Sequence, residues 1–291
     1  MDGLRHLYPV RTLCPVLALS VSGYYSWLNR QKKPRANREP ALKVAILTVH
    51  QKSRETYGAE RIRASLVEKG ISVGMWTVKK LRREMGLVCR QRRHWKQKAW
   101  SMEQLPAAPN ILNRQFHVVR SNTIWMSDIT YIRTREGWLY VAGIKDGCTK
   151  EIIGYAFSSQ MTASLVLQAV RKALEKCRPS GNLVLHSDQG GQYRSAAYTK
   201  FLKKNNITIS MSRRGNCYDN APMESFWGLL KTEWLRGQGL LSMRQAETAI
   251  REYIEEFYNR FRIQKGLGYR SPSAYAAWKK RTEKKFYGVR P

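Results

Sequence analysis

The chain has 291 residues, of which 52 are Lys or Arg and 21 are Asp or Glu, so its formal net charge is +31. The length predicts two domains, and a hydrophobic content of 43% excludes a chain that is disordered throughout. The charge favours nucleic acid as the partner, with a ribosomal-type or membrane-surface protein as the alternative.

Two further classes of protein are excluded by the sequence. No apolar run approaches the ~20 residues of a membrane-spanning helix, so we expect no membrane partner. The five cysteines are widely spaced and form no C-x-x-C pair, which is typical of reduced thiols in a cytoplasmic protein. The five histidines do not combine with them at zinc-ligand spacing.

The first part of the chain is the more basic and is predicted to be helical. Residues 1–115 carry 23 Lys and Arg against 7 Asp and Glu, without the alternation of a strand. A turn over Ser20-Val21-Ser22-Gly23 separates the first two predicted helices. The five predicted helices are Thr12–Leu19, Tyr24–Arg30, Leu42–Gln51, Ala59–Lys69 and Met75–Met85.

The last two of these helices match a helix-turn-helix. Each is closed by a glycine, Gly70 or Gly86, and the connection between them is short and contains Gly74. The second helix carries cations that would face DNA, with an ordinary helical hairpin and a solvated basic face as the alternative. These candidate DNA contacts are Lys79, Lys80, Arg82 and Arg83.

A polar, proline-containing stretch follows and indicates a domain boundary. The basic run Arg90–Lys98 is either an arm that follows DNA or a solvated linker. We expect a helical helix-turn-helix region at 1–95, a basic linker at 96–116, a catalytic core at 117–236 and a C-terminal helical extension at 237–291.

Beyond residue 117 the pattern changes to alternating strands and helices. β-Branched and aromatic runs predict strands at Thr123–Arg133, Trp138–Ile144, Glu151–Phe157, Asn182–His186 and Ile207–Met211. Helices are predicted at Thr162–Cys177, Ser195–Lys204 and Pro222–Trp234. The order β-β-β-α-β-α-β-α predicts an α/β fold with a mixed five-stranded sheet and helices on its faces.

Three acids stand at key places in this order. Asp128 lies within the first predicted strand, Asp188 directly follows the fourth, and Glu224 lies in the first turn of the last helix. If the first and fourth strands are neighbours, the two aspartates meet. Clustered carboxylates can hold magnesium, and two divalent cations about 4 Å apart can clamp both oxygens of a phosphoryl displacement.

Each acid alone also has an ordinary structural explanation. Asp128 would be an edge-strand charge, Asp188 an Asx turn, and Glu224 a charge that complements the helix dipole. The three together, in this element order, favour the metal site.

The runs around these acids resemble the DDE transposase and retroviral integrase superfamily, most closely the OrfB transposases of the third insertion-sequence family. The motifs are Trp-Met-Ser-Asp128-Ile-Thr-Tyr, His-Ser-Asp188-Gln-Gly-Gly-Gln-Tyr and Gly215-Asn-Cys-Tyr-Asp-Asn-Ala-Pro-Met-Glu224-Ser-Phe-Trp. The likeness spans nearly the whole chain. It implies an RNase H-like integrase core in which the three acids are the catalytic metal ligands and Lys231 contacts the DNA end.

The resemblance also implies an activity and partners. The activity is metal-dependent cleavage of DNA and strand transfer, with two Mg²⁺ ions, or Mn²⁺ in their place, at each site. The partners are double-stranded DNA at the element ends and target, an upstream OrfA protein or its fusion, and further copies of the chain on DNA. The expected location of the protein is the bacterial cytoplasm, at the nucleoid. Arg213 and Arg214 are further expected DNA contacts.

Two features of the sequence leave alternatives open. Gln264 stands where the family usually has a histidine, which puts the role of that position in doubt. The polar segment Ser212–Ala221 is either a mobile loop over the site or a turn into the helix, with Asn220 as cap and Pro222 early in the helix. The competing functions are a non-catalytic DNA-binding regulator and a ribonuclease acting on RNA–DNA hybrids.

Overall fold

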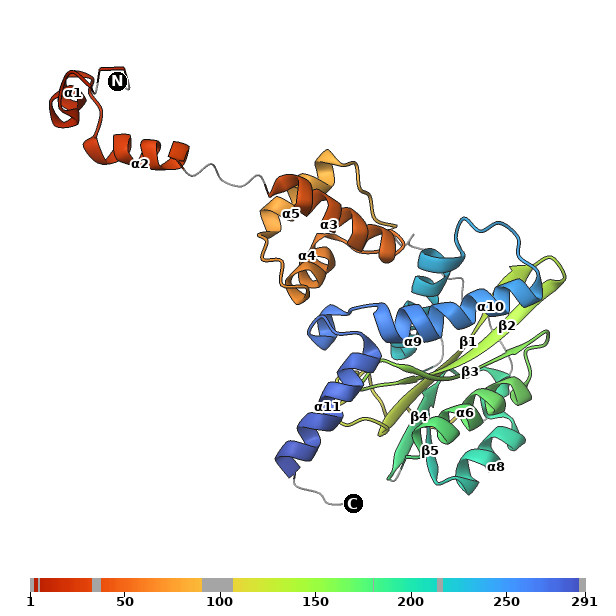
Figure 1. The fold of residues 1–291 in the computed structure, drawn as a ribbon. Coiled ribbons are helices and arrows are strands. Elements are labelled where there is room, and N and C mark those ends of the chain that lie inside the picture. Colours follow the sequence, from red (N-terminus) through yellow and green to blue (C-terminus); the bar gives the residue numbers. More distant parts are fainter. Residues whose placement is uncertain are drawn as a thin grey trace.

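A five-stranded sheet is covered on its two faces by helices from the later part of the chain, whereas the first five helices lie apart from it (Figure 1). The structure is a computed structural model that describes residues 3–4, 6–32, 38–90, 107–179, 181–213 and 217–287. Most of the basic run Arg90–Lys98, and residues 96–106 of the expected linker, lie outside these ranges.

The strands follow the order β3-β2-β1-β4-β5. β1 pairs with β2 antiparallel and with β4 parallel, and β4 pairs with β5 parallel. The sheet is therefore mixed, and the expected adjacency of the first and fourth strands is confirmed. The strands are β1 Ile124–Thr134, β2 Gly137–Asp146, β3 Ile152–Ser158, β4 Leu183–Ser187 and β5 Ile207–Met211.

The two faces of the sheet are covered by different helices. On one face, α6 (Ala163–Cys177), the short α7 (Gly191–Arg194) and α8 (Ala196–Lys204) enclose a core built around Trp125, Ala142 and Leu185. On the other face, α9 (Ala221–Leu230) and α10 (Met243–Glu252) cover Met126, Val141 and Ile152. This arrangement confirms the predicted α/β fold with an RNase H-like core.

The N-terminal region is helical, as predicted. Its helices are α1 Val10–Val16, α2 Val21–Lys32, α3 Glu39–Lys52, α4 Ala59–Glu68 and α5 Met75–Glu84. The predicted turn at residues 20–23 was wrong, because α2 already begins at Val21. The side chain of Ser20 accepts a hydrogen bond from the backbone N–H of Gly23 at 2.9 Å, which draws residues 21–23 into the first helical turn.

The helices α3 to α5 share a core with the C-terminal extension. This extension continues after α10 as the π-helix η3 (Tyr253–Phe261), a turn, and α11 (Pro272–Tyr287). Ile263 and Tyr269, from the turn, pack into the core of α3–α5. The hydroxyl of Tyr57 donates to the carbonyl of Phe261 at 3.1 Å and accepts from the N–H of Ile263 at 2.9 Å.

Charged groups add to this junction. The guanidinium carbon of Arg54 lies 3.5 Å from the centre of the Trp234 ring. The ammonium of Lys265 lies 3.2 Å from a carboxylate oxygen of Glu60. Elements more than 170 residues apart in sequence thereby form one body.

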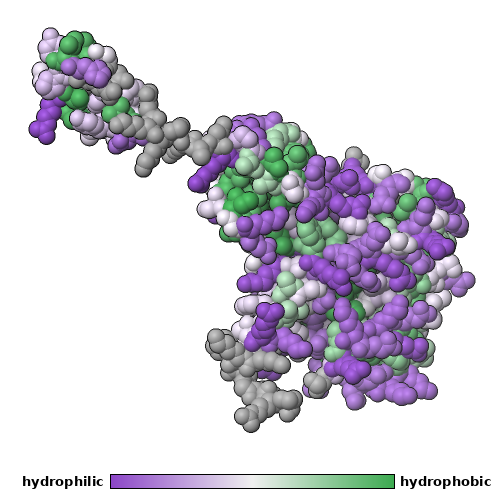
Figure 2. All heavy atoms as spheres, in the orientation of Figure 1, coloured by the Kyte–Doolittle hydropathy of each residue, from purple (hydrophilic) through white to green (hydrophobic). Residues whose placement is uncertain are grey.

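The surface is strongly polar over the sheet-containing part, whereas hydrophobic side chains gather on the N-terminal helices (Figure 2). Within the described ranges, no helix is long and apolar enough to cross a membrane. Four cysteines of the described part (Cys14, Cys89, Cys148 and Cys177) are thiols that form no disulfide.

The junction yields a prediction about Tyr57, which is 1% exposed. Replacing Tyr57 by Phe leaves the buried N–H of Ile263 without its acceptor, so the free energy of unfolding should fall by about 2 kcal/mol. Unfolding in denaturant measures this free-energy difference. The control is Tyr8→Phe, because the Tyr8 side chain is 56% exposed. Equal losses in both variants would contradict the assigned role.

Candidate active site

Asp128 lies in the middle of β1, opposite Gly143 of β2. Directly opposed residues of an antiparallel pair point to the same face of the sheet. A Cβ atom on Gly143 would lie 2.9 Å from Trp227 and 3.3 Å from Met223, both on α9. The missing side chain at Gly143 therefore lets α9 approach the sheet on the face that carries Asp128.

Asp188 follows directly after β4, the parallel neighbour of β1. Its carboxylate accepts a hydrogen bond from the N–H of Gly190 at 3.0 Å, so the alternative of an Asx turn is also realised. The parallel register pairs Met126 of β1 with His186 of β4, so Asp188, two residues further along, lies beside Asp128.

Glu224 lies in the first turn of α9, as predicted. Two contacts fix the start of this helix on the sheet. The side-chain amide of Asn220 donates to the carbonyl of Ser127 at 3.0 Å, and the ammonium of Lys145 donates to the carbonyl of Pro222 at 3.1 Å. Pro222 is early in the helix as expected, but the predicted cap is wrong, because the Asn220 side chain bonds to β1 and makes no cap hydrogen bond.

The acids influence one another electrostatically. Burial raises the pKa of Asp128 well above its usual range, and the charges of Asp188 and Glu224 raise it further. Burial also raises the pKa of Asp188, although hydrogen bonding from Gly190 and the charge of Arg194 oppose this shift. The carboxylates therefore resist joint ionisation unless a cation accompanies them.

The donor chemistry fits a hard divalent cation, because all three candidate ligands offer carboxylate oxygens. In the described part of the chain, however, no three Asp, Glu, His or Cys side chains already form a group that could hold a metal ion. The two aspartates are brought together by the sheet, while Glu224 reaches the site from a separate helix.

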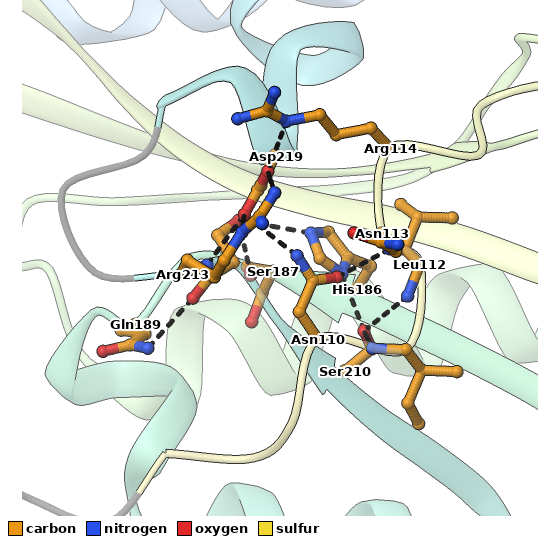
Figure 3. Close-up of polar contacts among 12 residues, drawn as sticks. Asn110, Leu112, Asn113, Arg114, His186, Ser187, Gln189, Ser210, Arg213 and Asp219 are labelled. Carbon is orange, nitrogen blue, oxygen red and sulfur yellow. Dashed lines mark hydrogen bonds and ion pairs between the residues drawn. The ribbon is translucent and has the colours of Figure 1, made fainter.

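Asp219 forms the centre of a polar network beside this site (Figure 3). Its side chain is fully buried. It accepts hydrogen bonds from the side chains of Asn110, Arg114 and Arg213, each at 2.9 Å, and from the N–H of Arg213. These contacts hold the pKa of Asp219 well below its usual range, chiefly through Arg213. Residues 110–114, expected within a linker, are thus tied to the segment that leads into α9.

His186 stands beside this network and is fully buried. Its ring nitrogens contact the hydroxyl oxygens of Ser210, at 2.8 Å, and Ser212, at 3.2 Å. Burial lowers the pKa of His186 to about 4, so the ring is neutral at physiological pH. The histidine of the His-Ser-Asp motif therefore ties β4 to β5 and the segment that follows it.

Lys231 lies at the end of α9, and its ammonium is 5.1 Å from the ring centre of Tyr131 on β1. Burial lowers the pKa of Lys231, and the charge of Asp128 acts in the opposite direction. The predicted continuous helix to Trp234 was wrong in one respect, because Lys231–Leu235 is a π-helix, η2. There Glu233 is buried against Arg262, whose guanidinium lies 2.7 Å away.

The other candidate DNA contacts lie in three different settings. Lys79, Lys80 and Arg83 are exposed on α5. Arg82 is half-buried and donates to the carbonyl of Leu87 at 3.2 Å, so its side chain is used within the protein. Arg213 is engaged by Asp219, and Arg214 lies outside the described residues.

Gln264 belongs to the turn of the C-terminal extension. Its backbone forms an isolated antiparallel bridge with Arg270, and its carbonyl accepts from the N–H of Tyr269 at 2.9 Å. Its side-chain nitrogen is buried and has no hydrogen-bond partner among the described residues. The position is therefore part of the turn that packs against α3–α5.

Sequence patterns missed two residues that shape the site. Lys145 is 6% exposed beneath α9, and burial lowers its pKa to about 7. Its place inside the apolar run of β2 was the available signal. Asp219 appears in the sequence only as one residue of a motif. Its hydrogen-bond partners Asn110 and Arg114 are more than 100 residues away, so no local pattern reveals them.

Comparisons with known proteins agree with this architecture. Residues 118–217 and 205–272 match the integrase core domain, and residues 27–95 match an HTH-like domain. A 31 kDa protein of insertion element IS600 from Shigella sonnei is 44% identical over 263 residues, covering 90% of this chain and 97% of that protein. Transposase InsF of insertion sequence IS3A from Escherichia coli is 34% identical over 270 residues, covering 92% and 94% of the two chains.

The chain belongs to the IS3 family of insertion-sequence transposases. The transposase is thus an enzyme of the polynucleotidyl transferase type that binds DNA. Among solved structures, the HTLV-2 integrase catalytic core domain in complex with magnesium is 15% identical, with a TM-score of 0.41, covering 54% of this chain and 97% of that one.

The network around Asp219 generates a pH-dependent prediction. Asp219→Asn should lower the free energy of unfolding by about 2 kcal/mol at pH 7, because the hydrogen bonds that Arg114 and Arg213 donate to the charged carboxylate are weakened or lost. The folded-state pKa is depressed, so the stabilisation is complete above the ordinary Asp value near ~4 and is lost as the pH falls below it.

Chemical denaturation at pH 7 and pH 3 measures this difference. Glu256→Gln removes the exposed pair with Arg260 and serves as the control, with an expected loss under about 0.5 kcal/mol. A loss for Asp219→Asn that is the same at both pH values would contradict the electrostatic account.

Burial of Lys145 should make the free energy of unfolding depend on pH in the opposite direction. Its folded-state pKa, about 7, lies below the unfolded value, so the stability of the wild type should rise as the pH increases from 6 to 9. Lys145→Met removes the buried amine and should be more stable than the wild type at pH 6 by about 2 kcal/mol, with a smaller difference at pH 9.

Unfolding at these two pH values tests the prediction, with Lys200→Met, at an exposed position of α8, as the control. A stability difference that stays the same between pH 6 and pH 9 would show that the pKa of Lys145 is not lowered in the folded protein.

Proposed function

We propose that this transposase cuts and joins DNA at the site formed by Asp128, Asp188 and Glu224. The observation that carries the proposal is the parallel pairing of β1 with β4, whose register brings Asp128 and Asp188 side by side. The raised pKa of Asp128, caused by burial and by the other two acids, supports a site completed by a cation. The match to the integrase core domain supports the same chemistry.

The metal expected here is Mg²⁺, held by the three carboxylates, with Mn²⁺ as a substitute. Two bound ions would stabilise the charge on the attacking and leaving oxygens of the displacement. The chain contributes the placement of the carboxylates. Asn220 and Lys145 hold the start of α9 on the sheet, and this keeps Glu224 within reach of the aspartates.

The reaction has two balanced steps. In the first, the oxygen of water forms a bond to phosphorus, and the bond from phosphorus to the 3′ oxygen breaks, leaving a 3′-hydroxyl at the element end. In the second, this hydroxyl attacks a target phosphodiester and releases a new 3′-hydroxyl there. The number of phosphodiester bonds is unchanged in the second step, so no energy-rich cofactor is needed.

Lys231 is proposed to hold a phosphate of the DNA end. Its ammonium lies beside Tyr131 on β1, three residues from Asp128. The charge of Asp128 acts to raise the pKa of Lys231, against the larger lowering by burial. The exposed cations of α5 would hold a second stretch of duplex, because phosphate contacts do not depend on sequence. Arg213, which stays half exposed while it pairs with Asp219, and Arg214 are assigned to the same role.

Assembly on DNA is also part of the proposal. Two element ends and one target must meet, so we assign the active form to several copies of the chain on DNA, together with an OrfA protein or as its fusion. A purely regulatory role is not favoured, because the family match includes the catalytic core as well as the HTH-like domain.

The central prediction concerns Glu224→Gln. The variant should bind DNA with the affinity of the wild type but lose at least about 10²-fold in cleavage and joining, because one charge at the reacting centre is removed. Labelled duplexes carrying the ends of the element, with Mg²⁺, measure both activities. Glu247→Gln, on α10, is the matched control.

Equal cutting by the wild type and Glu224→Gln would overturn the proposal. Loss of DNA binding together with cutting would show that the substitution acts through the fold, and Glu224 would then lose its assigned role.

A further inference from the structure

We propose that α1 and α2 form a second helix-turn-helix, whose helix α2 reads base edges in the major groove of DNA. The inference rests on the DNA-binding function of the transposase. The match to an HTH-like domain begins at residue 27, so α1 and the first half of α2 lie outside it. The buried residues of this pair, Leu13, Cys14 and Tyr24, belong to none of the three larger hydrophobic cores.

The connection between the helices has the length of such a motif. α1 ends at Val16 and α2 begins at Val21, which leaves a four-residue turn. Ala18 adopts a left-handed conformation with φ of 52°, and the N–H of Leu19 donates back to the carbonyl of Cys14 at 2.9 Å. The chain therefore reverses tightly after α1.

The start of α2 is fixed as tightly as the end of α1. The Ser20 hydroxyl oxygen accepts from the N–H of Gly23 at 2.9 Å. A Cβ atom on Gly23 would lie only 2.6 Å from that oxygen, so glycine leaves the space that the cap needs. The orientation of α2 relative to the turn is thus set by local contacts.

The exposed face of α2 carries hydrogen-bonding side chains. They recur at the spacing of one helix face, i, i+3, i+4 and i+7, and all four are exposed: Ser22, Tyr25, Ser26 and Asn29. Tyr24, on another face of the helix, is buried. Asn can bond adenine in a bidentate manner and Ser can bond either kind of edge, so this face suits direct reading of bases.

The corresponding face of α5 is chemically different. Its exposed residues at the same spacing are Trp76, Lys79, Lys80 and Arg83, of which the three cations suit phosphates. The segment around α2 is attractive to DNA as well, since residues 3–38 contain seven Lys and Arg and neither Asp nor Glu. The two helix pairs would therefore have different roles: α5 would bind the DNA backbone, and α2 would recognise the base sequence.

Apart from Tyr25, which also carries a hydroxyl, the exposed large hydrophobic side chains of the pair lie off the hydrogen-bonding face of α2. Leu7 is 72% exposed, Val16 80% and Leu19 51%, and these three lie on α1 or beside it, while Trp27 of α2, 41% exposed, lies outside the i, i+3, i+4, i+7 positions of that face. The polar face of α2 is exposed to solvent. Contact with another protein through this face is the competing outcome that the test separates.

The test is selection of binding sites from random duplexes by the full chain, without divalent metal so that no DNA is cut. The wild type should enrich a defined sequence. The variant Ser22→Ala/Ser26→Ala/Asn29→Ala should bind that sequence about 10- to 100-fold more weakly and keep its affinity for unrelated duplex within about twofold. Alanine favours helix, so α2 should persist, and circular dichroism checks it.

Two further variants sharpen the comparison. Lys79→Ala/Lys80→Ala/Arg83→Ala should weaken binding to all sequences and reduce the salt dependence by about 2 to 3 units. Asn205→Ala, at the exposed end of α8, is the matched control and should enrich the same sequence as the wild type.

The proposal is overturned if the α2 variant enriches the wild-type sequence with unchanged affinity, or if the wild type enriches no sequence while binding DNA well. A change of oligomeric state in the α2 variant with sequence preference intact would assign the face to protein contact and would also overturn it. Failure of the wild type to bind any duplex would instead count against the proposed function.

Discussion

The contact between the start of α9 and the strands β1 and β2 governs the geometry of the site. Gly143 leaves room for Trp227, the amide of Asn220 reaches the carbonyl of Ser127, and Lys145 donates to the carbonyl of Pro222. Because Ser127 precedes Asp128 in β1, the same contact that seats the helix also fixes the distance between Glu224 and the first aspartate. A shift of α9 would separate the two elements that the chemistry requires together.

The acids of this basic protein fall into two groups with different neighbours. Asp219 and Glu233 are buried against arginines, so their charges are balanced within the protein. Asp128 and Asp188 have raised pKa values, chiefly through burial, and Asp128 also feels the charges of the other candidate acids. Two neighbouring buried carboxylates are unfavourable for the fold alone. The expected binding of a cation between these carboxylates would explain why they lie together.

Much of this architecture followed from local patterns. Strand periodicity located β1 to β5 within one or two residues, and the element order placed Asp128, Asp188 and Glu224 correctly along them. Local patterns could not show that Asn220 bonds β1 in place of capping α9, because the alternative partner is 93 residues away. The π-helix at Lys231, the buried amine of Lys145 and the docking of α3–α5 on the turn around Ile263 also depend on tertiary packing.

The central claim is that the three carboxylates together hold the divalent metal when DNA is bound. Crystals of the transposase with a DNA end and Mn²⁺, examined by anomalous scattering, test it most directly. The account predicts metal in contact with Asp128 and Asp188, with the Glu224 carboxylate as a further ligand at about 2.0–2.2 Å. Metal bound elsewhere, or bound with Glu224 turned away while DNA occupies the site, would contradict it.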